Sequence, residues 1–125
     1  MSPADNTATV LAFYRQAFND GEPELAAAHL GATYTQHNPQ APDGADGFIA
    51  YVHQMRGRFP ELRLDIRRAI AEQDLVVTHS NMHLQPGDRG LAVADIWRLA
   101  DGKIVEHWDV MQPVPDESAN DNTMF

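Results

Sequence analysis

The chain has 125 residues, 43% of them hydrophobic, which is enough for one domain with one hydrophobic core. Lys and Arg number 9 against 18 Asp and Glu, and the resulting net charge of −9 opposes binding to nucleic acids and to acidic membrane surfaces. The absence of cysteine excludes disulfides, thiolate chemistry and cysteine zinc sites, and it fits a cytoplasmic protein. No apolar run is long enough for a membrane span, and the first residues do not resemble a signal peptide.

The N-terminal part of the chain predicts two helices. Apolar residues at helical spacing indicate a helix over residues 7–20, with Asn6 or Thr7 as its N-cap. A shorter helix is expected over residues 22–30, with a proline in its first turn, where proline is tolerated. Because only a few residues separate the two helices, we expect them to form a hairpin.

A short strand and a third helix follow. Tyr and Thr favour a strand within residues 33–39, which ends at an Asn-Pro pair. Residues 40–47 contain prolines and glycines and predict a loop. A third helix is expected over residues 47–58, with Asp46 as a plausible cap and Pro60 as the stop.

The second half of the chain predicts four antiparallel strands. From Leu62 apolar and charged residues alternate, and residues 69–71 can continue this strand after an irregularity. The next strand is expected over Leu75–Gln85, and a hairpin completes the run over residues 91–112. Helices followed by a strand meander predict an α+β fold, with the helices packed on one face of the sheet. The curvature of such a sheet can leave a cavity between the two layers.

The hairpin carries the candidate site. Asp101-Gly102 is a strong signal for a type I′ turn between two strands. Side chains alternate across a strand, so each strand has one face that mixes apolar and ionisable residues, which is how a pocket wall looks. On the first strand this face holds Leu91, Val93, Asp95, Trp97 and Leu99; on the second it holds Val105, His107, Asp109 and Met111.

Asp109 is the first candidate for acid/base chemistry, because partial burial raises the pKa of a carboxylate and strengthens it as a base. The alternative is a carboxylate paired with Arg98 or His107. His107 shares the face of Asp109 and can position a proton or a water, or it can simply form a hydrogen bond across strands. Asp95 can lie close to Asp109 on the neighbouring strand, or it can form a salt bridge with Lys103.

Histidines on the third-last strand leave its orientation open. His79 and His83 share one face with Asn81, and Met82 belongs to the opposite, more apolar face, so either face could line a pocket. A metal set can be drawn from His37, His79, His107 and Asp109. Their spacing is dispersed and contains no tight ligand motif, so the sequence predicts no metal site.

Aromatic residues and methionines in the helices are expected mainly in the core. Tyr51 and Met55 belong to the apolar stripe of the third helix and could also form the floor of a pocket. Trp97 lies on the candidate pocket face of the hairpin. Tyr34 could donate its hydroxyl to a substrate oxygen, although packing within the strand is the simpler interpretation.

Four runs of the chain resemble the SnoaL-like proteins of the nuclear-transport-factor-2-like superfamily, over roughly residues 7–115. The runs are Tyr34-x-Gln36-His37-Asn38-Pro39, Asp46-Gly47-Phe48, Asp95-Ile-Trp97-Arg98 and Asp101-Gly102-Lys103-Ile104-Val105-Glu106-His107-Trp108-Asp109-Val110. This resemblance implies a single domain over residues 1–125 with a cone-shaped α+β barrel, in which a curved, mostly antiparallel sheet wraps around three N-terminal helices. It also implies a homodimer, no cofactor, and a pocket between sheet and helices. We expect residues 116–125 to form a flexible tail.

The resemblance also implies roles for individual residues. In the cyclases of the family a buried Asp on the last strand is the acid/base, and it matches Asp109. A His on the preceding strand of those cyclases falls on Asp95 here, which is a departure from the family pattern. His37 and Asn38 match polar pocket residues of the first strand, and His79 is the polar residue of its strand nearest the pocket in the family pattern.

Three functions remain open at this stage. The first is a cofactor-independent enzyme acting on a small apolar substrate by acid/base chemistry: an isomerase, aldol-type cyclase, dehydratase or hydrolase. Asp109 would move the proton, while His37, Asn38, His79 and Asp95 would orient the substrate or stabilise an oxyanion. The second is a binding module that holds a small ligand without turnover. The third is a structural dimerisation domain whose pocket is filled by its own aromatic residues.

Overall fold

Five strands form one curved sheet in the computed structural model, which describes all residues 1–125. Their order across the sheet is β1-β5-β4-β3-β2. β1 runs parallel to β5, and every other pair is antiparallel, as the meander of the second half predicts. The strands are β1 (Leu30–Gln36), β2 (Arg63–Glu72), β3 (Leu75–His83), β4 (Leu91–Ala100) and β5 (Lys103–Pro113).

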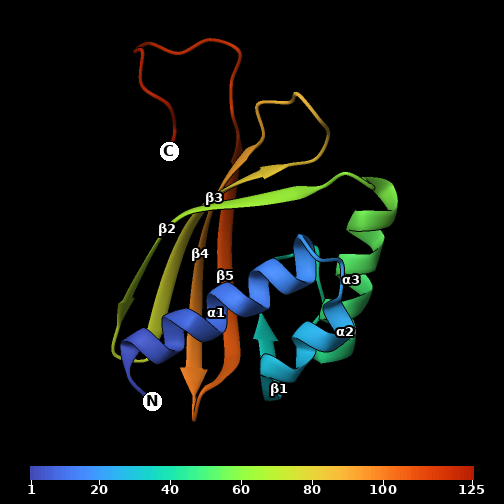
Figure 1. Cartoon of the computed structure of the whole chain (residues 1–125), viewed down its shortest axis with the longest axis vertical. Helices are drawn as coiled ribbons and strands as arrows, with labels where there is room; N and C mark the ends of the chain where they lie inside the picture. Colours follow the sequence, from blue (N-terminus) through green and yellow to red (C-terminus); the bar gives the residue numbers. More distant parts are fainter.

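Three helices cover one face of this sheet, and the sheet curves around them (Figure 1). They are α1 (Pro3–Phe18), α2 (Pro23–Ala26), which continues as a 3-10 turn over Ala27–His29, and α3 (Gly44–Arg58). The α+β fold predicted from the order of helices and strands is therefore confirmed. The second helix differs from the expected α-helix, since only its first four residues are α-helical and the rest form a 3-10 turn.

Helix α1 begins four residues earlier than predicted, because the chain supplies a capping box upstream. The Ser2 hydroxyl accepts a hydrogen bond from the backbone N–H of Asp5, and the Asp5 carboxylate accepts one from the backbone of Ser2, each at 3.0 Å. Asn6, a predicted cap, is instead buried within the helix. Helix α3 likewise begins early, with Asp43 rather than Asp46 at its N-cap position.

Two irregularities in pairing decide which side chains face the helices. In β2 the register shifts between Ile66 and Arg68, so Arg67 is an extra residue that reverses the alternation of the strand. Beyond it Ile70 faces outward and is 64% exposed. In β5 the pairing with β4 shifts in the same way, and Ile104 rather than Val105 points into the core. The predicted inward position of Val105 is therefore wrong.

Trp97 lies at the centre of the core between the sheet and α1. Its ring contacts Phe13 and Tyr14 edge-on, with centroid distances of 5.6 and 5.0 Å. Such a buried aromatic contributes a large share of the stability of a small domain, since replacing it by alanine costs about 3–5 kcal/mol. The face of β4 predicted to point inward does so, because Val93, Asp95, Trp97 and Leu99 are all buried.

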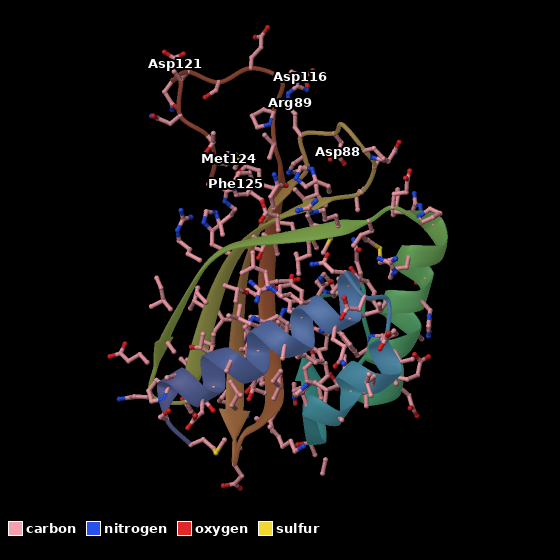
Figure 2. The ribbon with its side chains drawn as sticks, in the orientation of Figure 1. Asp88, Arg89, Asp116, Asp121, Met124 and Phe125 are labelled. Carbon is pink, nitrogen blue, oxygen red and sulfur yellow. The ribbon has the colours of Figure 1, made fainter.

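The last ten residues contain no helix or strand and return toward the outer face of the sheet. Figure 2 shows Arg89 of the β3–β4 connection beside Asp116, with which it forms an ion pair. The ring of Phe125 stacks on His79 with a centroid distance of 5.5 Å, and its carbonyl oxygen accepts a hydrogen bond of 3.3 Å from Arg68. The C-terminal residue thus covers part of the face opposite the helices.

Candidate functional site

A cavity of about 390 Å³ lies between the helices and the inner face of the sheet. Of its 21 lining residues 14 are hydrophobic, so it suits an apolar molecule of small size. The apolar lining comes from all layers of the fold: Phe18, Phe48, Tyr51, Met55 and Phe59 from α1, α3 and its C-cap; Met82, Val93, Trp97 and Met111 from the sheet; and Leu84 and Leu91 beside the β3–β4 connection.

Asp109 is the carboxylate that lines this cavity. It lies on the inner face of β5 and is partly buried, and this burial raises the pKa of its carboxyl group above the usual value of 3.8. The charge of His107 and a hydrogen bond from Asn38 lower the pKa, while the charge of Asp95 raises it further. The bond from Asn38 Nδ2 reaches Oδ2 over 3.0 Å, and Oδ1 remains free for a ligand.

Asp95 is the direct cross-strand partner of Asp109, because the bulge in β5 shifts the pairing with β4 by one residue. Its side chain is nevertheless 0% exposed and does not line the cavity. Oδ1 lies 2.8 Å from Nε2 of His107, and Oδ2 accepts a hydrogen bond of 3.1 Å from the Thr78 hydroxyl. The predicted catalytic role of Asp95 therefore needs correction: it lies behind His107 and cannot touch a ligand.

The hydrogen bonds that lead to Asp95 through Thr78 can run in only one direction. The indole N–H of Trp97 can only donate, and it donates to Thr78 Oγ1 over 3.0 Å. The Thr78 hydroxyl must then donate its own hydrogen to Asp95. Both carboxylate oxygens of Asp95 are thus occupied, one by a hydroxyl and one by an imidazole, as a buried charged group requires.

Both ring nitrogens of His107 are likewise engaged in hydrogen bonds. Its Nδ1 lies 2.8 Å from the side-chain oxygen of Gln36, and that oxygen is fixed as an acceptor because it also receives the backbone N–H of Asn38 at 3.0 Å. Nδ1 must therefore carry a hydrogen, while Nε2 is committed to Asp95. His107 lines the cavity, but neither of its nitrogens is free to take a proton from a ligand.

Three tyrosines surround the Asp109 end of the cavity. Burial, together with the negative charges of Asp95 and Asp109, raises the pKa of Tyr14 and of Tyr51, so both hydroxyls stay neutral. A hydrogen bond with Asp95 raises the pKa of Tyr14 further, which leaves Tyr51 as the donor available to a ligand. Burial also raises the pKa of Tyr34, whose hydroxyl accepts a hydrogen bond of 3.1 Å from Gln36 and keeps its own hydrogen. The cavity thus combines one carboxylate with several neutral donors.

His37, a predicted catalytic residue, does not line the cavity. Its side chain is 42% exposed, stacks on Trp108 at 4.8 Å and bonds Glu106 at 2.7 Å. Glu106 also accepts a hydrogen bond from Arg98, and the hydrogen bonds with His37 and Arg98 lower the pKa of Glu106. His37 therefore lies at the end of β1 outside the cavity, with its ring engaged by Trp108 and Glu106.

His79, a predicted ligand contact, lies on the outer face of the sheet. Its inward neighbours Thr78 and Ser80 are fully buried, so alternation turns His79 away from the cavity toward Arg68 and Phe125. The ambiguity of this strand is thereby settled in favour of its more apolar face. The remaining predicted contacts line the cavity: Tyr34, Asn38, Tyr51, Met55, Trp97 and His107.

Several cavity residues were missed by the sequence analysis, among them Gln36, Tyr14 and Arg58, which carry polar groups. Gln36 lies two residues from both Tyr34 and Asn38, so strand alternation alone indicates its shared face. Tyr14 belongs to the apolar stripe of α1, and no sequence signal separates it from an ordinary core residue. Arg58 ends α3, and its place at the cavity depends on how that helix packs.

The side chains of Asp95, His107 and Asp109 place possible ligand atoms within 4.8 Å of one another. A metal ion there would have to displace the hydrogen bonds that join Asp95, Thr78 and His107, since both oxygens and both ring nitrogens are already engaged. Only Asp109 offers an uncommitted oxygen, and one free ligand does not fit a closed or catalytic metal centre.

A family profile that describes the SnoaL-like domain matches residues 10–107. The chain belongs to the SnoaL-like family. The matched span runs from the middle of α1 into the first half of β5 and includes Asp95 and His107, whereas Asp109 follows two residues after its end. No curated protein sequence matches this SnoaL-like domain significantly.

Solved structures share the fold of this SnoaL-like domain at low sequence identity. TsrD from Streptomyces laurentii has a TM-score of 0.75 and 21% identity, over 89% of this chain and 90% of its own. A protein from Acidithiobacillus ferrooxidans named as a polyketide cyclase has a TM-score of 0.70 and 21% identity, over 89% and 91%. A protein from Kribbella flavida named as a ketosteroid isomerase reaches 0.75 and 16%, over 94% and 85%. At such identities the likeness establishes the fold alone.

None of the helices of this SnoaL-like domain combines the length and apolar character needed to cross a bilayer.

Proposed function

We propose that this SnoaL-like domain is a cofactor-independent enzyme that moves a proton on a small, largely apolar substrate. The observation that carries the proposal is Asp109, a carboxylate with a raised pKa and a free oxygen that faces an otherwise apolar cavity. A carboxylate in this setting is a stronger base than one in water, because burial disfavours its charge. The structural neighbours named as a cyclase and as an isomerase support the same reaction class.

The chemistry that fits these groups is proton abstraction from a carbon next to a carbonyl. Oδ1 of Asp109 would take the proton, since Asn38 occupies Oδ2. The negative charge that develops on the substrate oxygen would be stabilised by a neutral hydroxyl, and Tyr51 supplies such a donor beside Asp109. Return of the proton to another atom gives an isomerisation, and attack of the carbanion on a second carbonyl gives an aldol-type cyclisation.

Proton abstraction can be tested without knowing the natural product. We would incubate the protein in D₂O with small apolar ketones such as 4-phenylbutan-2-one and follow exchange of the protons next to the carbonyl by NMR. We expect Asp109→Asn to slow exchange at least about 100-fold. Asp121→Asn, which removes the same charge from the exposed C-terminal segment, is the matched control and should exchange like the wild type. Equal exchange by Asp109→Asn would remove this residue from the mechanism.

A binding module without turnover is the second candidate, and the saturation of the inner polar groups favours it. Asp95, His107 and Gln36 satisfy one another and leave few groups for chemistry. A module of this kind would bind the same ketones in the cavity with no exchange in any variant. The D₂O experiment therefore distinguishes the two functions directly.

We also propose that the domain forms a homodimer through the outer face of the sheet. Ile70, Val77, Ile96 and Trp108 pair in register across β2, β3, β4 and β5, which makes one continuous apolar row. Val77 is 38% and Ile96 39% exposed, and contiguous exposed apolar side chains of this kind commonly mark a protein interface. A second copy related by a two-fold axis would place the same row against itself.

A further inference from the structure

One positively charged side chain, Arg58, lines the cavity that holds Asp109. It is the last residue of α3 and is exposed, so it lies where the cavity opens to solvent. Its guanidinium carbon lies 5.2 Å from the centroid of the Phe59 ring, and Phe59 lines the same cavity. Stacking on an aromatic ring holds a guanidinium in place while leaving its N–H donors free at the edge.

Arg58 has no acidic partner. The arginines in ion pairs are Arg67, Arg89 and Arg98, and Arg56 is held by backbone carbonyl oxygens. An exposed cation at a helix C-terminus is favoured by the helix dipole, so Arg58 also suits the fold without any ligand. That role requires a positive charge, but it does not require a position against an apolar cavity.

Arg58 and Asp109 belong to different parts of this cavity. Arg58 is exposed at the end of α3, whereas Asp109 is partly buried on β5, and no ion pair joins them. Both line the one cavity, so a ligand that fills it would meet both charges. A ligand that fits has an apolar body, a reacting group at Asp109 and an anionic group at the mouth.

We propose that the substrates of this cavity are amphipathic carboxylates, whose apolar part fills the cavity and whose carboxylate pairs with Arg58. The planar guanidinium matches a carboxylate with two parallel hydrogen bonds, which gives it selectivity over neutral groups of the same size. The net charge of −9 makes such a local cation necessary, because the overall field repels anions. The inference rests on the proposed function only for the choice of this cavity as the substrate site.

The test is a binding comparison between two probes that differ in charge, 4-phenylbutanoate and its amide. The methionines provide the readout, since Met55, Met82 and Met111 line the cavity while Met1 and Met124 do not. With ¹³C-methyl methionine NMR, titration of either probe should shift the three cavity methyls and leave the other two unchanged. The acid should bind the wild type about fivefold more tightly than the amide at low salt, and added salt should reduce this preference.

Arg58→Gln should remove the preference for 4-phenylbutanoate. The variant should bind the acid more weakly than the wild type does, and its affinity for the amide should be unchanged. Arg15→Gln, at an exposed arginine of α1 outside the cavity, is the matched control and should keep the full preference. A helix-dipole role of Arg58 would alter stability but not the ratio of the two affinities.

Three results would overturn the proposal: equal binding of acid and amide by the wild type, a preference that survives Arg58→Gln, or no shift of the cavity methyls with either probe. The first two would leave the proton chemistry of Asp109 untouched. Loss of exchange in D₂O for Asp109→Asn, which tests that chemistry, does not depend on Arg58.

Discussion

Asn38 donates a hydrogen bond of 3.0 Å to the carboxylate of Asp109, which lies 71 residues further along the chain. The amide of Asn38 is oriented by its own oxygen, which accepts the backbone N–H of Gln40 at 2.8 Å, and its backbone N–H is bound by Gln36. The nitrogen therefore has to face Asp109. This bond stabilises the ionised carboxylate and opposes the effect of burial on its pKa.

Replacing Asn38 by alanine removes the donor and leaves burial in place. We expect the pKa of Asp109 to rise further, because the hydrogen bond from Asn38 lowers it in the wild type. The pH titration of the Asp109 carboxyl carbon by ¹³C NMR measures this directly. Glu106→Gln, which alters an acidic side chain of the same strand outside the cavity, should leave the titration in place. An unchanged or lowered pKa in Asn38→Ala would contradict the assigned role of this bond.

Asp109 is expected to reduce the stability of the fold at neutral pH. Its folded pKa is raised, so the folded state favours the protonated form, and the resulting stability is present at low pH and lost as the pH rises through the folded pKa. Asp109→Asn should therefore be more stable than the wild type at pH 7, and the difference should disappear at a pH below the ordinary value of 3.8.

The gain in the free energy of unfolding of Asp109→Asn should be small, about 0.5 kcal/mol, because Asp109 is only partly buried and solvent screens its charge. Thermal unfolding of both proteins between pH 3 and pH 8, with Asp121→Asn as the control, measures it. A variant that is less stable than the wild type at pH 7 but equally stable at pH 3 would show that the ionised carboxylate stabilises the fold. Stability gained by removing an active-site charge is a common trade-off with function.

The two cross-strand aspartates should respond differently to removal of their carboxylates. Asp95→Ala leaves the hydroxyl hydrogen of Thr78 without an acceptor and a nitrogen of His107 without a partner in the core, which should cost about 3 kcal/mol. Asp109→Ala removes a group that faces the cavity and should change the free energy of unfolding by less than about 1 kcal/mol. Urea denaturation of both variants makes the comparison, and equal losses would mean that Asp109 is as deeply integrated as Asp95.

Sequence periodicity was sufficient for the parts of this site that depend on regular strands. The inward face of β4 follows from alternation, and the period of two within β5 places His107, Asp109 and Met111 on one face. That this face of β5 is the inner one depends on the bulge after the Asp101-Gly102 turn, which shifts the pairing by one residue. Both turn residues have positive φ, as a type I′ turn requires. The inward position predicted for Val105 failed because a bulge, which has no sequence signal here, shifts the pairing.

How deeply each candidate residue is buried could not be predicted from sequence periodicity. Asp95 and Asp109 face the same side of adjacent strands. The pairing of β3 with β4 puts Thr78 beside Asp95, and the packing of the helices decides which carboxylate faces the cavity. The histidine pattern of β3 allowed either face, and the choice depends on which face the core needs. Arg58 and Tyr14 reach the cavity from helices, and their position depends on tertiary packing rather than on local sequence.

The apolar row on the outer face provides the final prediction. Ile96 lies in the middle of this row, paired with Val77 on one side and Trp108 on the other. If two copies pack through this face, Ile96→Lys places two like charges in a desolvated contact and should convert the dimer to a monomer. The fold itself should survive, because a side chain that is 39% exposed in one copy can extend a charge into solvent.

Light scattering coupled to size-exclusion chromatography measures the mass of each variant, and circular dichroism checks its fold. Leu25→Lys is the matched control, since Leu25 is 57% exposed on α2, away from the sheet, and should leave the dimer intact. A wild type that elutes as a monomer at all concentrations would refute the interface. A dimer that persists in Ile96→Lys would place the contact on another surface, and the exposed row would then lie free in solution.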